Sequence, residues 1–260
     1  SALADLVLRH PALHLRAGLA PDGLPQWHLA PPAPPELELC DWPEAGDARL
    51  DQWLEGDRAR GCDLRIAPWR AMLAQRGTLP PVLVLTLHHA IIDLPAMAIL
   101  LEDLFDLLAN QPLPDVLVDP VAICAAPPLN LAAAQAHFAS RFADLERIDL
   151  LAPPQVQGRM QTCQVELTAE VTARLRQRAK AAGAGTFAVL QSAWALILAR
   201  WTGRADATFG LTLAGRNLLQ GHDRTLAALI ATLPQRLDLS DLPDLDALLF
   251  RAQAETAALR

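Results

Sequence analysis

The chain has 260 residues, of which 52% are hydrophobic and 20% charged, and 22 Lys and Arg against 29 Asp and Glu leave a net charge of −7. This apolar fraction can build a full core, which excludes a disordered chain. The acidic balance without a basic cluster excludes the surface that nucleic-acid binding requires. No apolar run reaches the ~18 residues of a membrane span, so we expect no membrane partner.

The cysteines and the first residues indicate the cellular compartment in which the protein is expected. Cys40, Cys62, Cys124 and Cys163 are scattered, with no C-x-x-C pair and no spacing typical of metal ligands. They are interpreted as reduced core residues, which predicts a cytoplasmic protein. The first residues, SALADLVLRH, do not resemble a secretion signal.

Hydrophobic periodicity in the first half of the chain predicts alternating helices and strands. The predicted helices are 3–10, 48–59 and 95–110, and the predicted strands are 13–19, 26–29, 37–41 and 82–87. Pro21 and Gly23 favour a turn between the first two strands. The strand 82–87 is apolar at nearly every position, as in a strand buried on both faces, and it runs directly into His88.

The second half begins with a Pro-rich connection and then resumes the alternating pattern. Its predicted helices are 131–148, 169–182, 186–201 and 242–259, and its predicted strands are 160–167, 207–213 and 232–239. We therefore predict an α/β protein with an N-terminal lobe (1–110), a Pro-rich linker containing a helix (111–158) and a C-terminal lobe (159–260).

The adjacent pair His88-His89, with Asp93 four residues after the second histidine, stands at the end of the apolar strand. A neutral imidazole can take a proton from an attacking amine or hydroxyl at neutral pH, and a carboxylate nearby can shape the loop by pairing with an arginine. The same residues also fit a structural role, in which Asp93 neutralises the N-terminus of the following helix. The spacing by itself leaves both interpretations open.

Several segments, in order along the chain, resemble the condensation domains of non-ribosomal peptide synthetases, members of the chloramphenicol-acetyltransferase-like superfamily. The segment 87–93 (LHHAIID) is similar to the family's M-H-H-x-x-x-D-G motif. The other matching segments are 9–14 (RHPALH), 22–26 (DGLPQ), 190–206 (LQSAWALILARWTGRAD), 209–216 (FGLTLAGR) and 232–236 (TLPQR).

The resemblance implies two chloramphenicol-acetyltransferase-like lobes arranged as a V with a tunnel between them. A donor carrier protein would present an acyl or peptidyl thioester on its phosphopantetheine arm, and an acceptor carrier protein an aminoacyl thioester. An amide would form without a metal or a directly bound cofactor. Neighbouring synthetase modules would be the other partners.

The resemblance also implies roles for single residues. His89 would be the base or would orient the amine, and His88 would be structural. Asp93 would form a salt bridge that shapes the loop, with Arg216 as its partner across the lobes. The candidates for lining the substrate tunnel are Leu94, Gly215, Ala231 and Thr232.

This sequence departs from the family pattern at several polar or glycine positions. Leu94 replaces the glycine after the motif aspartate, and leucine adopts a positive φ only at a cost. Ala231 stands in place of an asparagine, Ala227 of a glycine and His14 of an arginine, and only a trace of the Tyr/Asp/Trp element is found at 119–123.

These departures favour reduced or absent catalysis, so a second hypothesis is a degenerate domain that serves as a docking platform for carrier proteins or a partner enzyme. A third is a stand-alone acyltransferase that uses CoA thioesters. The motifs also predict that about the first tenth and the last quarter of the family's domain are absent.

Overall fold

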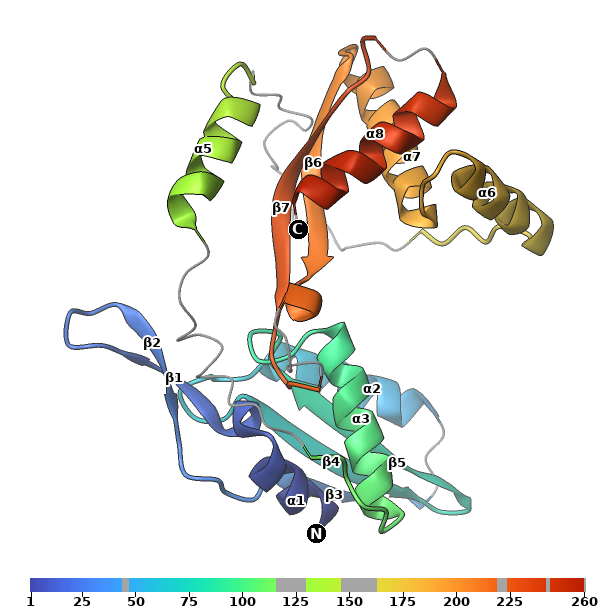
Figure 1. Ribbon diagram of the computed structural model, residues 1–260. Helices are drawn as coiled ribbons and strands as arrows, with labels where there is room; N and C mark the ends of the chain where they lie inside the picture. The colour runs from blue at the N-terminus through green and yellow to red at the C-terminus, as the bar shows by residue number, and fades with distance from the viewer. Residues whose placement is uncertain (44–46, 116–129, 146–162, 219–223, 242–243, 260) are drawn as a thin grey trace. The chain divides into compact units, whose positions relative to one another are not determined.

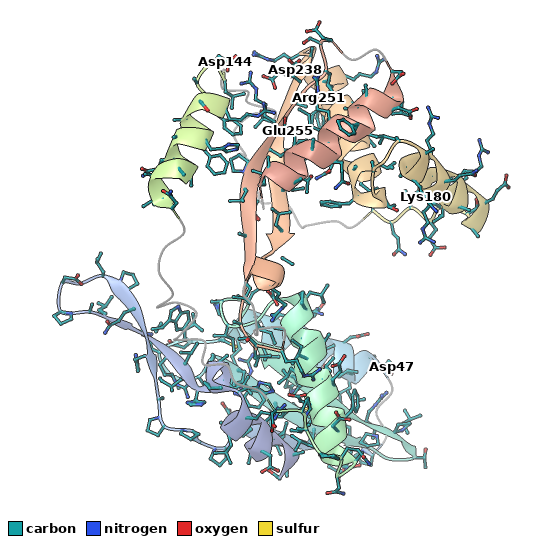
Figure 2. The ribbon with its side chains drawn as sticks, in the orientation of Figure 1. Asp47, Asp144, Lys180, Asp238, Arg251 and Glu255 are labelled. Atoms are coloured by element: carbon teal, nitrogen blue, oxygen red, sulfur yellow. The ribbon has the colours of Figure 1, made fainter. Side chains whose placement is uncertain are left out.

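The structure is a computed structural model that describes residues 1–43, 47–115, 130–145, 163–218, 224–241 and 244–259 (Figure 1). Figure 2 draws the side chains on the same ribbon. The helices are α1 (Ala2–Arg9), α2 (Asp47–Arg60), α3 (Leu94–Leu108), α5 (Leu131–Arg141), α6 (Ala169–Ala181), α7 (Thr186–Thr202) and α8 (Leu245–Ala258). The strands are β1 (Leu15–Leu19), β2 (Pro25–Leu29), β3 (Leu37–Asp41), β4 (Trp69–Arg76), β5 (Leu79–Leu87), β6 (Asp206–Ala214) and β7 (Ile230–Asp238). Short 3-10 helices cover Pro11–His14 and Gly215–Leu218.

The chain forms two compact units. Unit 1 comprises Ser1–Pro127 with Ala214–Ile230, and unit 2 comprises Pro128–Leu213 with Ala231–Arg260. The expected division at 111–158 stays a prediction, and the units differ from it in one respect that matters for the site. Residues 214–230, which the sequence analysis placed with the C-terminal lobe, pack with unit 1.

Unit 1 is built on a three-stranded sheet with the order β3-β4-β5, in which β3 pairs parallel to β4 and β5 pairs antiparallel. Trp69 and Ala71 of β4 join the main core with α1 and α3. The alternate residues Met72 and Ala74 join a second cluster with Trp53 of α2. Because successive side chains of a strand point to opposite faces, α1 and α3 cover one face of the sheet and α2 the other (Figure 1).

The expectation that residues 82–87 are buried on both faces is wrong. They form the second part of β5, an edge strand whose residues are exposed or only partly buried. The central strand is β4, which is buried at five of its eight positions although it carries Arg70. The strand prediction at 160–167 is also not met in its described part, since residues 163–167 are not in a strand. Residues 160–162 lie outside the described residues.

Unit 2 has a two-stranded sheet, β6-β7, whose buried residues Ala207 and Leu237 share a core with α7 and α8. A buried polar cluster links the same elements: Gln191 of α7 donates to Gln235 of β7 (3.2 Å) and to Thr256 of α8 (2.8 Å). Among the described residues, no single helix is long and apolar enough to cross a membrane. Within the same described ranges, one pair of helices, α6 and α7, passes that test together, and the pair is bent by 97°.

Candidate active site around His89

The two histidines follow β5 directly and differ in how they are held. The backbone N–H of His88 donates to Pro68 O (2.8 Å), and its Nδ1 accepts the N–H of Ala90 (3.0 Å). His88 is therefore tied to the turn that it opens. His89 is exposed in that turn, and within the described residues its imidazole has no hydrogen-bond partner. Within the described residues, the His88 ring thus has one nitrogen occupied, whereas both nitrogens of the exposed His89 ring are left open to a substrate.

Asp93 is the next polar residue after this turn, and it is 2% exposed. Its Oδ1 accepts the N–H of Ala96 (2.9 Å), so it is the N-cap of α3. The same Oδ1 accepts from Arg216 Nη2 (2.8 Å), and Oδ2 accepts the N–H of Leu229 (2.8 Å). Burial by itself would raise the pKa of this carboxyl, but the hydrogen bonds from Arg216, Ala96 and Leu229 outweigh burial and keep the pKa below its usual range.

Arg216 holds its own part of the chain as well as Asp93. Its guanidinium donates to the carbonyl oxygens of Thr225 and of Ala227 (3.0 Å). Residues 214–230 belong to unit 1, so the ion pair with Asp93 forms within one compact unit. The structure thus brings together Asp93 and Arg216, which the resemblance paired and which are 123 residues apart in the chain. The pair lies within unit 1 and not across two lobes as expected, because residues 214–230 pack with the first part of the chain.

Gly215 has a specific reason to be glycine. Its N–H donates to Leu229 O (2.9 Å), and a Cβ atom at Gly215 would lie 2.5 Å from that oxygen. This contact brings the backbone at 215 against residue 229, whose own N–H reaches Asp93. Gly215 therefore supports the ion pair through a close backbone approach.

A family model described as the condensation domain matches residues 1–259 of this chain. The chain belongs to the condensation-domain family. Malpibaldin synthetase from Mortierella alpina is 29% identical over 209 residues, which are 73% of this chain and 4% of that protein. The chain thus spans only a small part of this curated relative.

Two solved structures show the same fold. The first condensation domain of the calcium-dependent antibiotic synthetase, in complex with a substrate analogue, matches with a TM-score of 0.76 and 23% identity, over 99% of this chain and 64% of that chain. The X-domain in complex with OxyB from teicoplanin biosynthesis matches with a TM-score of 0.81 and 22% identity, over 99% and 60% of the two chains. At such identities the likeness shows the α/β condensation fold and no particular activity.

The structure gives the positions of three residues that are expected to line the condensation domain's tunnel. Leu94 is the first residue of α3 and is 82% exposed. Asn110 is the only non-glycine residue of the described chain with a positive φ, so the expected backbone cost at Leu94 does not arise. Ala231 and Thr232 lie on β7 in unit 2, where Thr232 Oγ1 is 3.0 Å from Thr212 Oγ1.

Asp103 of α3 is a buried carboxylate, 0% exposed, that was not among the predicted site residues. Its Oδ2 accepts from Arg9 Nε (2.7 Å) and lies 2.9 Å from His10 Nε2, and its Oδ1 accepts from Arg224 Nη2 (2.7 Å). The signal was present in the sequence, because Asp103 is an acid on the apolar side of a helix, between Leu100 and Leu104. Arg9 and His10 belong to a motif of the resemblance, and here they bind this carboxylate.

A second missed cluster lies beside β5. Asp57 of α2 accepts from Arg70 Nε (2.7 Å) and from Thr86 Oγ1 (2.6 Å), and both members of the ion pair are buried. The cluster anchors α2 to two strands of the sheet. Within the described residues, no group of three or more His, Cys, Asp or Glu side chains is placed to hold a metal ion.

Proposed function

We propose that the chain forms an amide bond between a thioester-bound acyl or peptidyl donor and a thioester-bound aminoacyl acceptor. The observation that carries the proposal is the exposed imidazole of His89, which has no hydrogen-bond partner in the part of the chain that the structure describes. It lies in a turn bounded by the tethered His88 on one side and by the buried Asp93–Arg216 pair on the other. Membership of the condensation-domain family supports this choice of substrate class.

The geometry suggests a separate role in the reaction for each of these residues. The His89 imidazole accepts a proton from the acceptor amine as the amine nitrogen attacks the thioester carbonyl carbon. The new C–N bond forms, the C–S bond breaks, and the proton passes from the imidazolium to the departing thiolate. His88 and Asp93 do not touch the substrate: they hold the turn, and the Arg216 pair keeps Asp93 ionised.

The finer parts of the proposal rest on the family resemblance. They are a V of two lobes with a tunnel lined by Leu94, Gly215, Ala231 and Thr232, and substrates delivered on the phosphopantetheine arms of donor and acceptor carrier proteins. The proposal also includes neighbouring synthetase modules as partners. It includes a cytoplasmic location, which is inferred from the cysteines. No cofactor other than the carriers' arms is part of the proposed reaction.

The test is the substitution His89→Ala, with His28→Ala on the exposed strand β2 as the matched control. Donor and acceptor are N-acetylcysteamine thioesters of N-acetylated and free amino acids, and the amide is quantified by mass spectrometry. We expect His89→Ala to lower the rate by about 100-fold or more, as for loss of a general base. His28→Ala should match the wild type, and circular dichroism checks the fold of both variants.

The docking-platform function is the second candidate. The X-domain of the same fold was solved in complex with OxyB, and this chain lacks the family's glycine and asparagine at Leu94 and Ala231. If the wild type and His89→Ala both give no amide with any thioester pair, the catalytic proposal fails. If both also bind a phosphopantetheinylated carrier protein equally well, the docking function is supported.

A further inference from the structure

Residues 224–229, which belong to unit 1, are attached to α3 and its N-cap at two points. At one end, Arg224 donates to Asp103 Oδ1 (2.7 Å) and to Glu102 Oε2 (3.0 Å). At the other end, the N–H of Leu229 donates to Asp93 Oδ2 (2.8 Å). Asp93 and Asp103 are ten residues apart, which corresponds to about 15 Å along a helix axis. The segment is therefore held against α3 over roughly the length of that helix's first three turns.

The side chain between these two points is also fixed. Leu226 is 3% exposed and belongs to the core cluster that contains residues of α1, β4 and α3. Arg216 donates to the carbonyl oxygens of Thr225 and Ala227 and to Asp93. A displacement at Arg224 would therefore pass through 225–227 to Arg216 and Leu229, two of the three donors to Asp93.

Asp103 requires several hydrogen-bond partners because it is fully buried. A buried carboxylate is tolerated only when it is paired and hydrogen-bonded, and here Arg9, His10 and Arg224 supply those partners. Burial would raise the pKa of Asp103, but the hydrogen bonds from Arg9 and Arg224 keep the pKa below its usual range. The carboxylate is thus ionised at neutral pH and holds Arg224 in one place.

We propose that Asp103 is a positioning residue for the His89 turn, acting through Arg224 and residues 225–229. It holds Arg224 so that the Leu229 N–H and the Arg216 guanidinium meet Asp93, which closes the turn behind His89. The consequence for catalysis rests on the function proposed above. The mechanical link between Asp103 and the turn does not depend on that function.

The test uses Arg224→Gln, because the Arg224 side chain is 33% exposed and its replacement leaves Arg9 and His10 to pair Asp103. Arg224→Lys keeps the charge and serves as the rescue variant. Arg60→Gln is the matched control: Arg60 is on the same unit, and among the described residues its hydrogen bonds go only to exposed Glu36.

Amide hydrogen exchange in the full chain gives the first readout, at Leu229, at Ala96 and at Ala90 within the His89 turn. In Arg224→Gln we expect exchange to accelerate about tenfold or more at all three amides, with Arg224→Lys closer to the wild type and Arg60→Gln unchanged. A purely local structural role would accelerate exchange at Leu229 and leave Ala90 unaffected. That outcome, or no change at Leu229, overturns the proposal.

Kinetics with the N-acetylcysteamine thioesters give the second readout. We expect Arg224→Gln to lower kcat about tenfold while KM stays within about twofold, because the base is misplaced and the substrate contacts are kept. An unchanged kcat in an active enzyme contradicts the positioning role. If the wild type forms no amide but exchange at Ala90 still responds to Arg224→Gln, the positioning link holds and the proposed function fails.

Discussion

Asp93 illustrates how one side chain can satisfy two interpretations that the sequence presents as alternatives. As a helix cap it accepts the N–H of Ala96, and as a loop-shaping anion it pairs with Arg216 and with the N–H of Leu229. An ionised carboxylate has about four lone-pair sites, so the three donors do not compete. The structural role of Asp93 is therefore what orders the turn that carries His89.

Gly215→Ala tests whether the close backbone approach at 215 supports this arrangement. The added Cβ would lie 2.5 Å from Leu229 O, so the backbone must shift. We expect the free energy of unfolding to fall by about 1–3 kcal/mol, as in other overpacked sites, measured by urea denaturation. Gly56→Ala, in the middle of α2, is the control and should raise the free energy of unfolding. Nothing lies within 4 Å of a Cβ at this position, and alanine stabilises a helix by about 0.5–1 kcal/mol relative to glycine. Equal effects of the two substitutions would contradict this explanation.

At the scale of helices and strands, the strand order in the sheet of unit 1 is the feature that the local sequence pattern predicts least well. The apolar run 82–87 predicts a central strand, yet the order β3-β4-β5 puts β4 in the centre and β5 at the edge. Burial of Arg70 on β4 is possible because Asp57 of α2 pairs with it. By contrast, the α1–α3 contact depends on residues that the sequence already marks, since Arg9 and His10 meet Asp103 at the end of α1.

His10 makes the stability of this contact depend on pH. Burial lowers the pKa of His10 below its usual 6.5, Arg9 and Arg224 add to the decrease, and Asp103 opposes it. The unfolded chain therefore binds more protons below pH 6.5, and the free energy of unfolding falls as the pH drops through that range. The lowered pKa values of Asp93 and Asp103 act in a separate window, below their usual 3.8.

The substitution His10→Gln keeps an amide donor near the position of Nε2 and removes the titration. We expect its free energy of unfolding to vary less between about pH 7 and pH 5 than that of the wild type, by urea denaturation at several pH values. His28→Gln, on exposed β2, should keep the wild-type pH dependence. A wild-type slope in His10→Gln would show that another group is responsible.

At the scale of the whole molecule, unit 2 presents an apolar surface that its own core does not use. Phe187, Leu190, Trp194, Ile197 and Trp201 repeat at helical spacing along α7 and are 46%, 60%, 46%, 52% and 63% exposed. Residues three, four and seven apart lie on one face of a helix, so these side chains form a continuous stripe. The opposite side of α7 packs against the sheet and α8.

The stripe predicts strong binding of the hydrophobic dye ANS. The double substitution of Leu190→Glu and Ile197→Glu should lower bound-dye fluorescence about twofold or more while the circular dichroism spectrum stays unchanged, because glutamate is a good helix former and the stripe is interrupted. Leu8→Glu, at a single exposed site on α1, is the control and should have little effect. Unchanged fluorescence in the double variant would mean that the stripe is covered in solution.

Most of the helices and strands could be predicted, because periodicity, caps and turn residues act within a few positions. The predicted helices 169–182 and 186–201 match α6 and α7 to within one residue at each end, and the predicted strand 37–41 is β3. His88, His89 and Asp93 could be singled out from their spacing, and Arg216 from the family resemblance. Asp103 and Arg224 could not be paired in advance, since 121 residues separate them.

The amino-acid sequence alone determined the α/β class, the acidic and largely apolar character, and the motif that places two histidines before a helix-capping aspartate. Only the tertiary structure decided that residues 214–230 pack with unit 1, that β4 and not β5 is central, and that one buried carboxylate holds two arginines and a histidine. The physical reason is the distance along the chain over which each kind of interaction acts. Local patterns report which face of an element is apolar, whereas strand order and ion pairing depend on residues that meet only after the chain has folded.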